Sequence, residues 1–409
     1  MENESKLVEH LFRHEAGKIT SVMAKIFGFS RLEEAEDIVQ DTFIAAYETW
    51  KLKGIPENPT AWLYKVARNK FLNHVKRQNN YQRIISENKS VFPLEYTITA
   101  KIEEELQHID DNQIQMLFAL CHPSIPEDSQ VALALKTLSG FSIEEIAKSF
   151  LTNKENIQKR LYRAREKIKE EKIELEIPNP DQMIVRLDRV LKCIYLLFSE
   201  GYYSNSEEII IRKDLCLEAM RLCLLLIEYK TTNRPEVNAL MALMCFHVSR
   251  FESRSNEYGE LLTLEEQDKT LWNQELIETG NYFLTASASE EVFSDYHIEA
   301  MIAFYHTKED SEEKWKMLLN LYNHLLKLKD NPIVAMNRAY IMSKALTIDE
   351  AILELHSLKG LEKNHLYHAL LGKLYSGIDK TKSRSYFEKA LSLANSESEK
   401  KLIQKKYLS

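Results

Sequence analysis

The sequence predicts an all-α protein, with two small helical domains followed by a long helical extension. Glycine and proline are scarce, with 10 and 9 in 409 residues, which disfavours the many turns of a barrel or sandwich. Apolar residues recur at helical spacing through most of the chain. Two capping-box patterns, at 142–145 and 152–155, each begin a helix, and together they predict a helix-turn-helix.

Charge is distributed unevenly along the chain, whose formal net charge is −8. Residues 1–173 carry 25 Lys/Arg and 26 Asp/Glu, whereas residues 174–409 carry 29 and 36. An acidic protein binds DNA poorly as a whole. Any contact with DNA is therefore expected to come from local basic patches, with the help of a partner.

The sequence disfavours several other classes of protein. Its five cysteines form no CxxC pair and lie mostly in apolar runs, which is typical of reduced, buried thiols in a cytoplasmic protein. The charged N-terminus is not a signal peptide, and the longest apolar run, which starts at Leu240, is too short to span a membrane. Glycine-rich phosphate loops and catalytic motifs are absent. We expect no enzyme activity, no cofactor and no metal.

A first domain is expected over residues 1–85. Its segment "RLEEAEDIVQDTFIAAYETW" has helical spacing with one buried face, made of Ala35, Ile38, Val39, Thr42, Phe43, Ala46, Tyr47 and Trp50. The opposite face carries Asp37, Gln40, Asp41 and Ile44. From the residues alone, simple solvation accounts for this polar face.

A basic helix is predicted next, with Asn58 as its N-cap and Pro59 at its first position. Between Pro59 and Ser86 there are six Lys/Arg and no Asp/Glu. One side of the helix is apolar, and the other carries Trp62, Lys65, Asn69, Asn73, Lys76 and Arg77. Such a face suits single-stranded nucleic acid, because cations contact phosphates, amides contact base edges and aromatic rings stack on bases. A solvated face with Trp62 turned into the core is the alternative.

After a linker at 86–108, a second domain is expected over residues 109–173, with the helix-turn-helix at its end. In the second helix of this motif the apolar stripe consists of Ile157, Leu161, Ala164 and Ile168. The outward residues are Glu155, Asn156, Lys159, Tyr162, Arg163 and Glu166, and the stripe is flanked by Gln158, Arg160 and Arg165. A recognition helix reads bases with its outward residues and contacts phosphates with its flanks.

The order of these motifs resembles the bacterial extracytoplasmic-function (ECF) sigma factors of the sigma-70 class. "AEDIVQDTF" is similar to their core-binding signature and "NPTAWLYKVARNKFLNHVKR" to their promoter-melting segment. "SIEEIAKSFLTNKENIQKRLYRAREKI" is similar to the segment that reads the −35 element. The resemblance covers about residues 5–173. It implies sigma region 2 over 1–85, sigma region 4 over 109–173, and two partners, the clamp and flap of core RNA polymerase and promoter DNA.

The resemblance also implies a role for each polar face. The polymerase-binding residues would be Asp37, Gln40 and Asp41. The −10 element would be contacted by Trp62, Lys65, Arg68, Asn69, Lys70, Asn73, Lys76 and Arg77. The −35 element would be contacted by Lys154, Glu155, Asn156, Gln158, Lys159, Arg160, Arg163 and Arg165. Asn73 stands where the family often has Asp, which leaves the promoter preference open.

The extension is expected to follow a linker at 174–183, with a helical part at 184–330 and repeats at 331–409. "ALLGKLY" followed by "SRSYFEKAL" matches the tetratricopeptide pattern, and Ala335 and Ala369 are 34 residues apart, one repeat length. Four helices are expected at 332–344, 349–358, 364–376 and 380–394. Such repeats stack into a curved array with a concave binding face. A helical bundle with accidental spacing is the alternative.

Stretches such as "YLLFSEGYYS" and "NPIVAMNRAY" resemble one group of these sigma factors that has a long tetratricopeptide-like extension. In that group the resemblance implies that the extension replaces an anti-sigma factor, with a small YCII-like (DGPF-type) protein as partner. Within "EGYY", Gly201 predicts a helix stop. Glu200, Tyr202 and Tyr203 are alternatively a pocket or a domain contact.

Two questions of function stay open at this level. A helix-turn-helix regulator with a repeat scaffold, which never acts as a sigma factor, is the alternative to a sigma factor. The extension either binds a partner and supports transcription, which we favour, or covers the basic helices and inhibits it. We favour support because the excess negative charge of the extension is diffuse.

Overall fold

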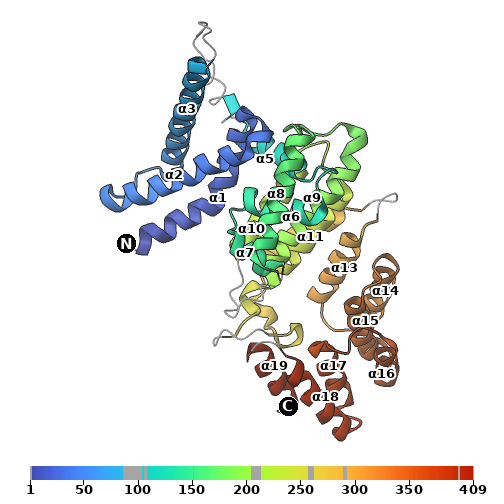
Figure 1. The fold of residues 1–409 in the computed structure, drawn as a ribbon. Coiled ribbons are helices and arrows are strands. Elements are labelled where there is room, and N and C mark those ends of the chain that lie inside the picture. The colour runs from blue at the N-terminus through green and yellow to red at the C-terminus, as the bar shows by residue number, and fades with distance from the viewer. Residues whose placement is uncertain are drawn as a thin grey trace. The chain divides into compact units, whose positions relative to one another are not determined.

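The computed structural model describes residues 2–85, 104–105, 108–150, 152–203, 213–256, 262–288, 293–394 and 397–408. These residues form helices and no strand, which confirms the predicted all-α fold class. None of their helices is both long enough and apolar enough to cross a membrane. The chain divides into two compact units, residues 1–204 with 212–228 and residues 205–211 with 229–409, and most of their helices are labelled in Figure 1.

The first domain consists of three long helices, α1 (Glu2–Phe27), α2 (Leu32–Lys53) and α3 (Pro59–Ile85), with a short 3-10 turn, η1 (Phe29–Arg31), between the first two. The predicted start of α3 is confirmed. The backbone N–H of Ala61 donates to the Asn58 side chain at 2.9 Å, and Pro59 occupies the first helical position. The apolar side of α3 buries Leu63, Ala67 and Phe71 against α1 and α2.

Helix α2 buries its predicted apolar stripe with one exception. Seven of the eight residues are buried: Ala35, Ile38, Val39, Thr42, Phe43, Ala46 and Trp50. Tyr47 is 44% exposed, so its predicted burial is wrong. At 3.6 residues per turn Tyr47 stands between buried Phe43 and exposed Ile44, at the edge of the stripe, where its hydroxyl can reach water.

The second domain contains α5 (Ile109–Leu120), α6 (Glu127–Leu138), α7 (Ile143–Ser149) and α8 (Lys154–Glu170), and α7 and α8 form the helix-turn-helix. The predicted capping box at α7 is confirmed, because the Ser142 N–H donates to Glu145 at 2.8 Å and the Glu145 N–H donates to Ser142 Oγ at 3.2 Å. The one predicted at α8 is wrong. Its N-cap is Asn153, which accepts from the Asn156 N–H at 2.9 Å. Asparagine caps helices at least as well as threonine.

The two domains pack against each other through α1, which contacts both α5 and α6. Gly17 permits the closest approach, because a Cβ at this position would lie 2.2 Å from the carbonyl oxygen of Leu138. Arg13 of α1 also pairs with Glu145 of α7 at 3.0 Å. The sequence contained no signal for this contact between the domains. The predicted linker at 86–108 lies almost wholly outside the described residues.

Helices α9 (Pro180–Tyr203) and α10 (Lys213–Glu228) begin the extension but belong to the first unit. Helix α9 packs on α5 and α6, and the Sγ atoms of Cys193 and Cys121 lie 3.5 Å apart. All five cysteines are buried and free, as predicted. Helix α9 continues through Gly201, so this glycine is not the helix stop that the sequence predicts.

The second unit starts with α11 (Pro235–Val248), α12 (Gln274–Ala286), α13 (Asp295–Thr307) and α14 (Glu312–Leu328). Three short 3-10 turns lie between α11 and α12: η2 (Phe251–Ser253), η3 (Leu264–Glu266) and η4 (Lys269–Leu271). Every residue of α11 from Val237 to Phe246 is buried. A helix that is apolar on all sides must be enclosed, and α12 and α13 pack on it.

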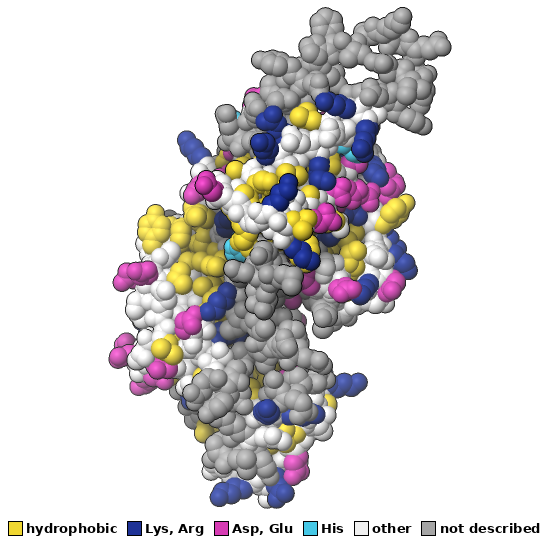
Figure 2. All heavy atoms as spheres, turned by 90° about the vertical axis from the view of Figure 1, so that its left-hand side faces the viewer, with side chains coloured by type: hydrophobic (Ala, Val, Ile, Leu, Met, Phe, Trp, Pro, Cys, Tyr) yellow, Lys and Arg dark blue, Asp and Glu magenta, His cyan; other side chains and the backbone are white. Residues whose placement is uncertain are grey.

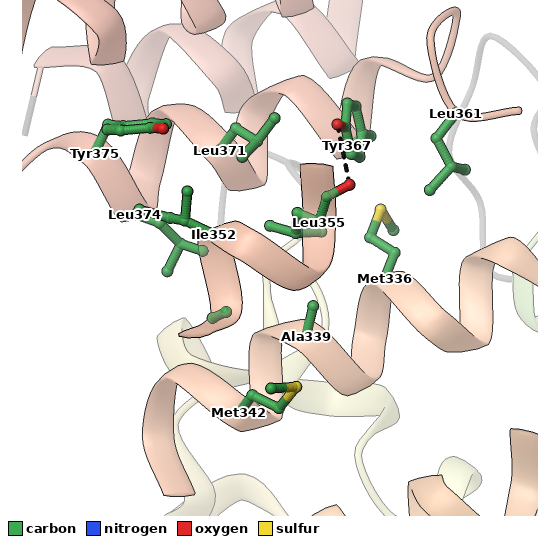
Figure 3. Close-up of a cluster of buried hydrophobic side chains, with 11 residues drawn as sticks. Met336, Ala339, Met342, Ile352, Leu355, Leu361, Tyr367, Leu371, Leu374 and Tyr375 are labelled. Carbon is green, nitrogen blue, oxygen red and sulfur yellow. Dashed lines mark hydrogen bonds between the residues drawn. The ribbon is translucent and has the colours of Figure 1, made fainter. Parts of the chain in front are cut away.

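The chain ends in α15 (Pro332–Ala345), α16 (Ile348–Ser357), α17 (His365–Tyr375), α18 (Lys380–Leu393) and α19 (Glu397–Leu408). The four predicted repeat helices are confirmed to within two residues. In Figure 3, Met336, Leu355 and Leu371 from α15, α16 and α17 share one core. The repeat pattern has glycine at position 372 for a steric reason. A Cβ on Gly372 would lie 2.9 Å from the Phe387 ring of α18.

Candidate nucleic-acid interface

The predicted −10 residues all lie on α3, and most of them face solvent. Trp62, Arg68 and Lys70 are partly buried, and the exposed ones are Lys65, Asn69, Asn73, Lys76 and Arg77. Trp62 contacts buried Trp50 edge-on, with ring centroids 5.4 Å apart. In the upper part of Figure 2, Lys and Arg side chains are interspersed with hydrophobic, uncharged and acidic ones over α2 and α3. The helix thus presents a mixed basic and amide face.

An open hollow of about 590 Å³ lies at the start of α3 and brings three of these residues together. It is lined by Asn58, Thr60, Ala61, Tyr64, Lys65, Arg68, Asn69 and Ile109. The Tyr64 hydroxyl donates to Glu15 of α1 at 3.1 Å. Burial and the adjacent Glu15 carboxylate raise the pKa of Tyr64, so the phenol stays protonated and fixed in orientation. The hollow therefore combines a rigid wall with a cationic rim.

The predicted polymerase-binding residues Asp37, Gln40 and Asp41 are exposed on one face of α2. Ile44 and Tyr47 follow on the same face at helical spacing and are 49% and 44% exposed. Asp41 lies 3.9 Å from Lys70 of α3, so one edge of this face meets the basic helix. An acidic patch continued by apolar side chains suits a protein partner with a basic and apolar surface.

The outward residues of α8 are exposed as predicted, except Glu166, which is partly buried. The apolar stripe of Ile157, Leu161, Ala164 and Ile168 is buried. Glu155, Asn156, Lys159 and Arg163 are exposed, together with Lys154, Gln158 and Tyr162. The four predicted base readers therefore lie within three turns of the α8 N-terminus and on its open side.

The flanks of α8 are engaged inside the chain, which sequence reasoning missed. Arg165 pairs with Glu36 of α2 at 2.5 Å, and Glu36 also accepts from Thr137 of α6 at 2.7 Å. Arg160 pairs with Asp128 at 3.1 Å. No local pattern points to these pairs, because the partners are 129 and 32 residues away in the sequence. Two cations predicted to contact phosphate therefore contact carboxylates here.

The candidate pocket in the extension is described only in part. Tyr202 is buried, at 4% exposure, and stacks on Phe198 with ring centroids 5.7 Å apart. Glu200 is partly buried, and the side chain of Tyr203 lies outside the described residues. Within the described ranges, no group of three or more His, Cys, Asp or Glu side chains is arranged to hold a metal ion.

The two N-terminal domains define a sigma-70-type factor. A model of sigma-70 region 2 matches residues 11–81, and a model of sigma-70 region 4 matches residues 115–168. The ECF RNA polymerase sigma-E factor of Haemophilus influenzae is 28% identical over 135 residues, 32% of this chain and 71% of that protein. The RNA polymerase sigma-H factor of Pseudomonas aeruginosa is 29% identical over 140 residues, 33% and 72% of the two chains.

The similarity continues beyond these domains. A family of unknown function, DUF6596, matches residues 186–288, and an uncharacterised protein of Rhizobium meliloti is 30% identical over 383 residues, 91% of this chain and 88% of that protein. The chain belongs to the ECF sigma-70-type factors, in the group that carries a long helical C-terminal extension. These matches support a sigma-factor role, and the matched sigma families are non-enzymatic. No solved structure matches the chain.

Proposed function

We propose that this protein acts in the cytoplasm as a sigma factor, which binds core RNA polymerase, recognises promoters and directs transcription initiation without catalysis of its own. One observation carries the proposal. The domains that match sigma regions 2 and 4 each expose a helix face of cations and amides, on α3 and α8. Two such faces in one chain fit a factor that contacts both opened and double-stranded DNA.

The hollow at the start of α3 accepts one unstacked base of the opened −10 strand. Lys65 and Arg68 at its rim contact the flanking phosphates, and the Asn69 amide contacts the edge of the base. Further along α3, Asn73 reads a second base, Trp62 stacks, and Lys70, Lys76 and Arg77 follow the backbone. Each stacked base contributes about 1–3 kcal/mol, which offsets part of the cost of strand opening.

Helix α8 enters the major groove of the −35 element. Glu155, Asn156, Lys159 and Arg163 read the base edges, because they are exposed on the first turns of the helix. Lys154, Gln158, Arg160 and Arg165 contact phosphates. Arg160 and Arg165 exchange their carboxylate partners, Asp128 and Glu36, for phosphate when DNA binds.

The acidic and apolar face of α2 docks on the polymerase clamp, and the second domain contacts the flap. In a pull-down with core polymerase, Asp37→Lys with Asp41→Lys reduces binding, because both carboxylates are exposed and become repulsive toward a basic partner. Asp188→Lys is the matched control, since Asp188 is an equally exposed aspartate within α9. If both variants bind core polymerase equally well, the docking assignment is wrong.

Run-off transcription tests the function directly. Core polymerase, this protein and genomic DNA fragments are expected to give discrete transcripts without any other sigma factor. The alternative, a helix-turn-helix regulator with a repeat scaffold, binds DNA but yields transcripts only when a resident sigma factor is added. Transcripts that appear only in that second mixture would establish the alternative.

The extension supports transcription through protein contacts, with a small YCII-like protein as the proposed partner. A cut at residue 177 would remove α9 and α10, which pack against the second domain, and would expose their apolar faces. A cut after Glu228 follows the boundary of the first unit instead. Residues 1–228 are expected to bind core polymerase but to transcribe poorly. A fragment more active than the whole chain would show that the extension inhibits.

A further inference from the structure

A carboxylate of the chain is held by cationic and hydroxyl groups of the repeat helices. Glu265, in the turn η3, uses both of its oxygens. Its Oε1 accepts from the Tyr340 hydroxyl and lies 3.0 Å from Lys344 Nζ, both on α15. Its Oε2 accepts from the ammonium group of Lys373, on α17. Three donor groups, two on α15 and one on α17, thus define a carboxylate-binding site.

The repeat core, and not Glu265, sets the spacing of the two helices that carry these donors. Met336 and Ala339 of α15 and Leu371 and Leu374 of α17 pack around Leu355 of α16, as Figure 3 shows. Side chains buried in one core cannot shift independently. The core therefore holds α15 and α17, the helices that carry the hydroxyl and the two ammonium groups, at a fixed spacing that does not depend on Glu265.

The electrostatics of the site favour a negative charge. Lys344 Nζ lies 5.8 Å from the centre of the Tyr340 ring, and Lys373 Nζ lies 5.5 Å from it. Partial burial alone would raise the pKa of Glu265, but the groups of Lys373, Tyr340 and Lys344 outweigh it and lower that pKa to about 2. The Glu265 side chain is still 40% exposed, so a competing carboxylate has access.

The same faces of α15 and α17 offer further contacts toward their N-termini. Asn337 and Ile333 precede Tyr340 and Lys344 at helical spacing on α15 and are exposed, and Leu366 is exposed two turns before Lys373 on α17. An amide and two apolar side chains beside a carboxylate site fit an extended peptide with an acidic residue. A lone inorganic anion would use none of these contacts.

We propose that the site formed by Tyr340, Lys344 and Lys373 binds a glutamate or aspartate of an acidic peptide in a partner protein. Glu265 occupies the site as an internal stand-in until the partner displaces it. The inference rests on the proposed role of the extension in protein contacts and names the chemistry of that contact. Because Glu265 is tethered, its effective concentration is on the order of millimolar. A partner must therefore add contacts with the neighbouring side chains.

A fluorescein-labelled peptide with the sequence of residues 262–273, LTLEEQDKTLWN, serves as the probe, read by fluorescence anisotropy with the full chain. Glu265→Gln is expected to bind it about tenfold more tightly than the wild type, because the tethered competitor is weakened. Adding Lys344→Gln and Lys373→Gln is expected to abolish this binding. Glu275→Gln, at an exposed glutamate of α12, is the matched control and binds like the wild type.

Three results would overturn the proposal. One is equal, weak binding of the peptide by the wild type and Glu265→Gln. Glu265 would then only stabilise the fold. Another is equal binding of a peptide in which both glutamates are changed to glutamine and the aspartate to asparagine. The third is displacement by a short oligonucleotide as effective as by unlabelled peptide, which makes the site a general anion site. The assay contains no polymerase, so peptide binding without run-off transcription would reject only the sigma-factor function.

Discussion

Helices α3 and α8 both expose a face suited to nucleic acid, but they differ in what their cations already contact. On α8, Arg165 and Arg160 lie 2.5 and 3.1 Å from carboxylates of the chain. On α3, Lys70 lies 3.9 Å from Asp41, which is 67% exposed, and such a surface pair contributes little. The proposed phosphate contacts of Arg165 and Arg160 would therefore replace close ion pairs, whereas that of Lys70 would replace a weak one.

Because Arg165 of the second domain pairs with Glu36 of the first, duplex binding by α8 is expected to depend on how the two domains are arranged. Glu36, which holds Arg165, lies on α2 beside Asp37 of the proposed polymerase face. A partner that draws α2 away from α8 would release Arg165 for its proposed phosphate contact, whereas Lys70 of α3 would have to leave only an exposed pair with Asp41 at 3.9 Å.

The largest effect is expected from removing the exposed amides and the aromatic ring of the α3 face. Asn69→Ala with Asn73→Ala removes two exposed amides at no cost in packing, and Trp62→Ala removes the stacking ring, which is worth about 1–3 kcal/mol per base. Permanganate footprinting of the open complex is expected to show strand opening reduced by about tenfold or more for the triple variant. Asn320→Ala, at an exposed asparagine of α14, is the control.

Because Trp62 also packs on Trp50, the double variant is compared with the triple one. Unchanged opening in the double variant would remove Asn69 and Asn73 from the interface.

The next effect comes from separating the domains. Gly17→Ala places a Cβ 2.2 Å from the Leu138 carbonyl oxygen, and such overpacking costs about 1–3 kcal/mol. The contact between α1 and α6 is expected to open, and affinity for duplex DNA is expected to rise because Arg165 is freed. Fluorophores on Glu48→Cys of α2 and Gln158→Cys of α8 report the separation, since the native cysteines are buried.

Gly377→Ala is the matched control, because a Cβ there meets nothing within 4 Å. A separation with no gain in duplex affinity would show that Arg165 is not what limits α8.

Features that depend on residues close in the sequence could be predicted. Contacts between segments far apart in the sequence could not. The stripe of Ile157 to Ile168 and the cap of Asn58 follow from helical spacing and local hydrogen bonds, and both are confirmed. The Glu36–Arg165 pair and the Gly17 contact join segments more than a hundred residues apart, and nothing local marks them. Of the candidate interface, the exposed faces could be predicted but not their partners inside the chain.

A smaller effect distinguishes base reading from phosphate contact on α8. Lys159→Ala is expected to cost about 1–3 kcal/mol at one base position and to relax specificity there. Arg165→Ala is expected to weaken all duplex sequences alike and to reduce the salt slope by about 1. Its loss of affinity is expected to be partly offset, because binding no longer requires breaking the Glu36 pair.

Binding to a set of promoter variants at several salt concentrations measures both quantities. An altered base preference in Arg165→Ala with none in Lys159→Ala would reverse the assigned roles.

The smallest effect concerns the Arg13–Glu145 pair, which joins α1 to the helix-turn-helix at 3.0 Å. Partial burial by itself raises the pKa of Glu145, but hydrogen bonds from Ser142 and Arg13 outweigh it and hold this pKa below its usual value. A carboxyl with a lowered folded-state pKa stabilises the fold above its unfolded pKa, and that stability is lost as the pH falls through the folded value. Below about pH 4 the domains are therefore expected to separate slightly in the same fluorophore assay, because the free energy of their contact falls by less than about 1 kcal/mol.

Glu145→Gln removes the titrating group, so it is expected to start more open at pH 7 and to respond less to acid. An identical response in both proteins would assign the acid sensitivity to other carboxylates.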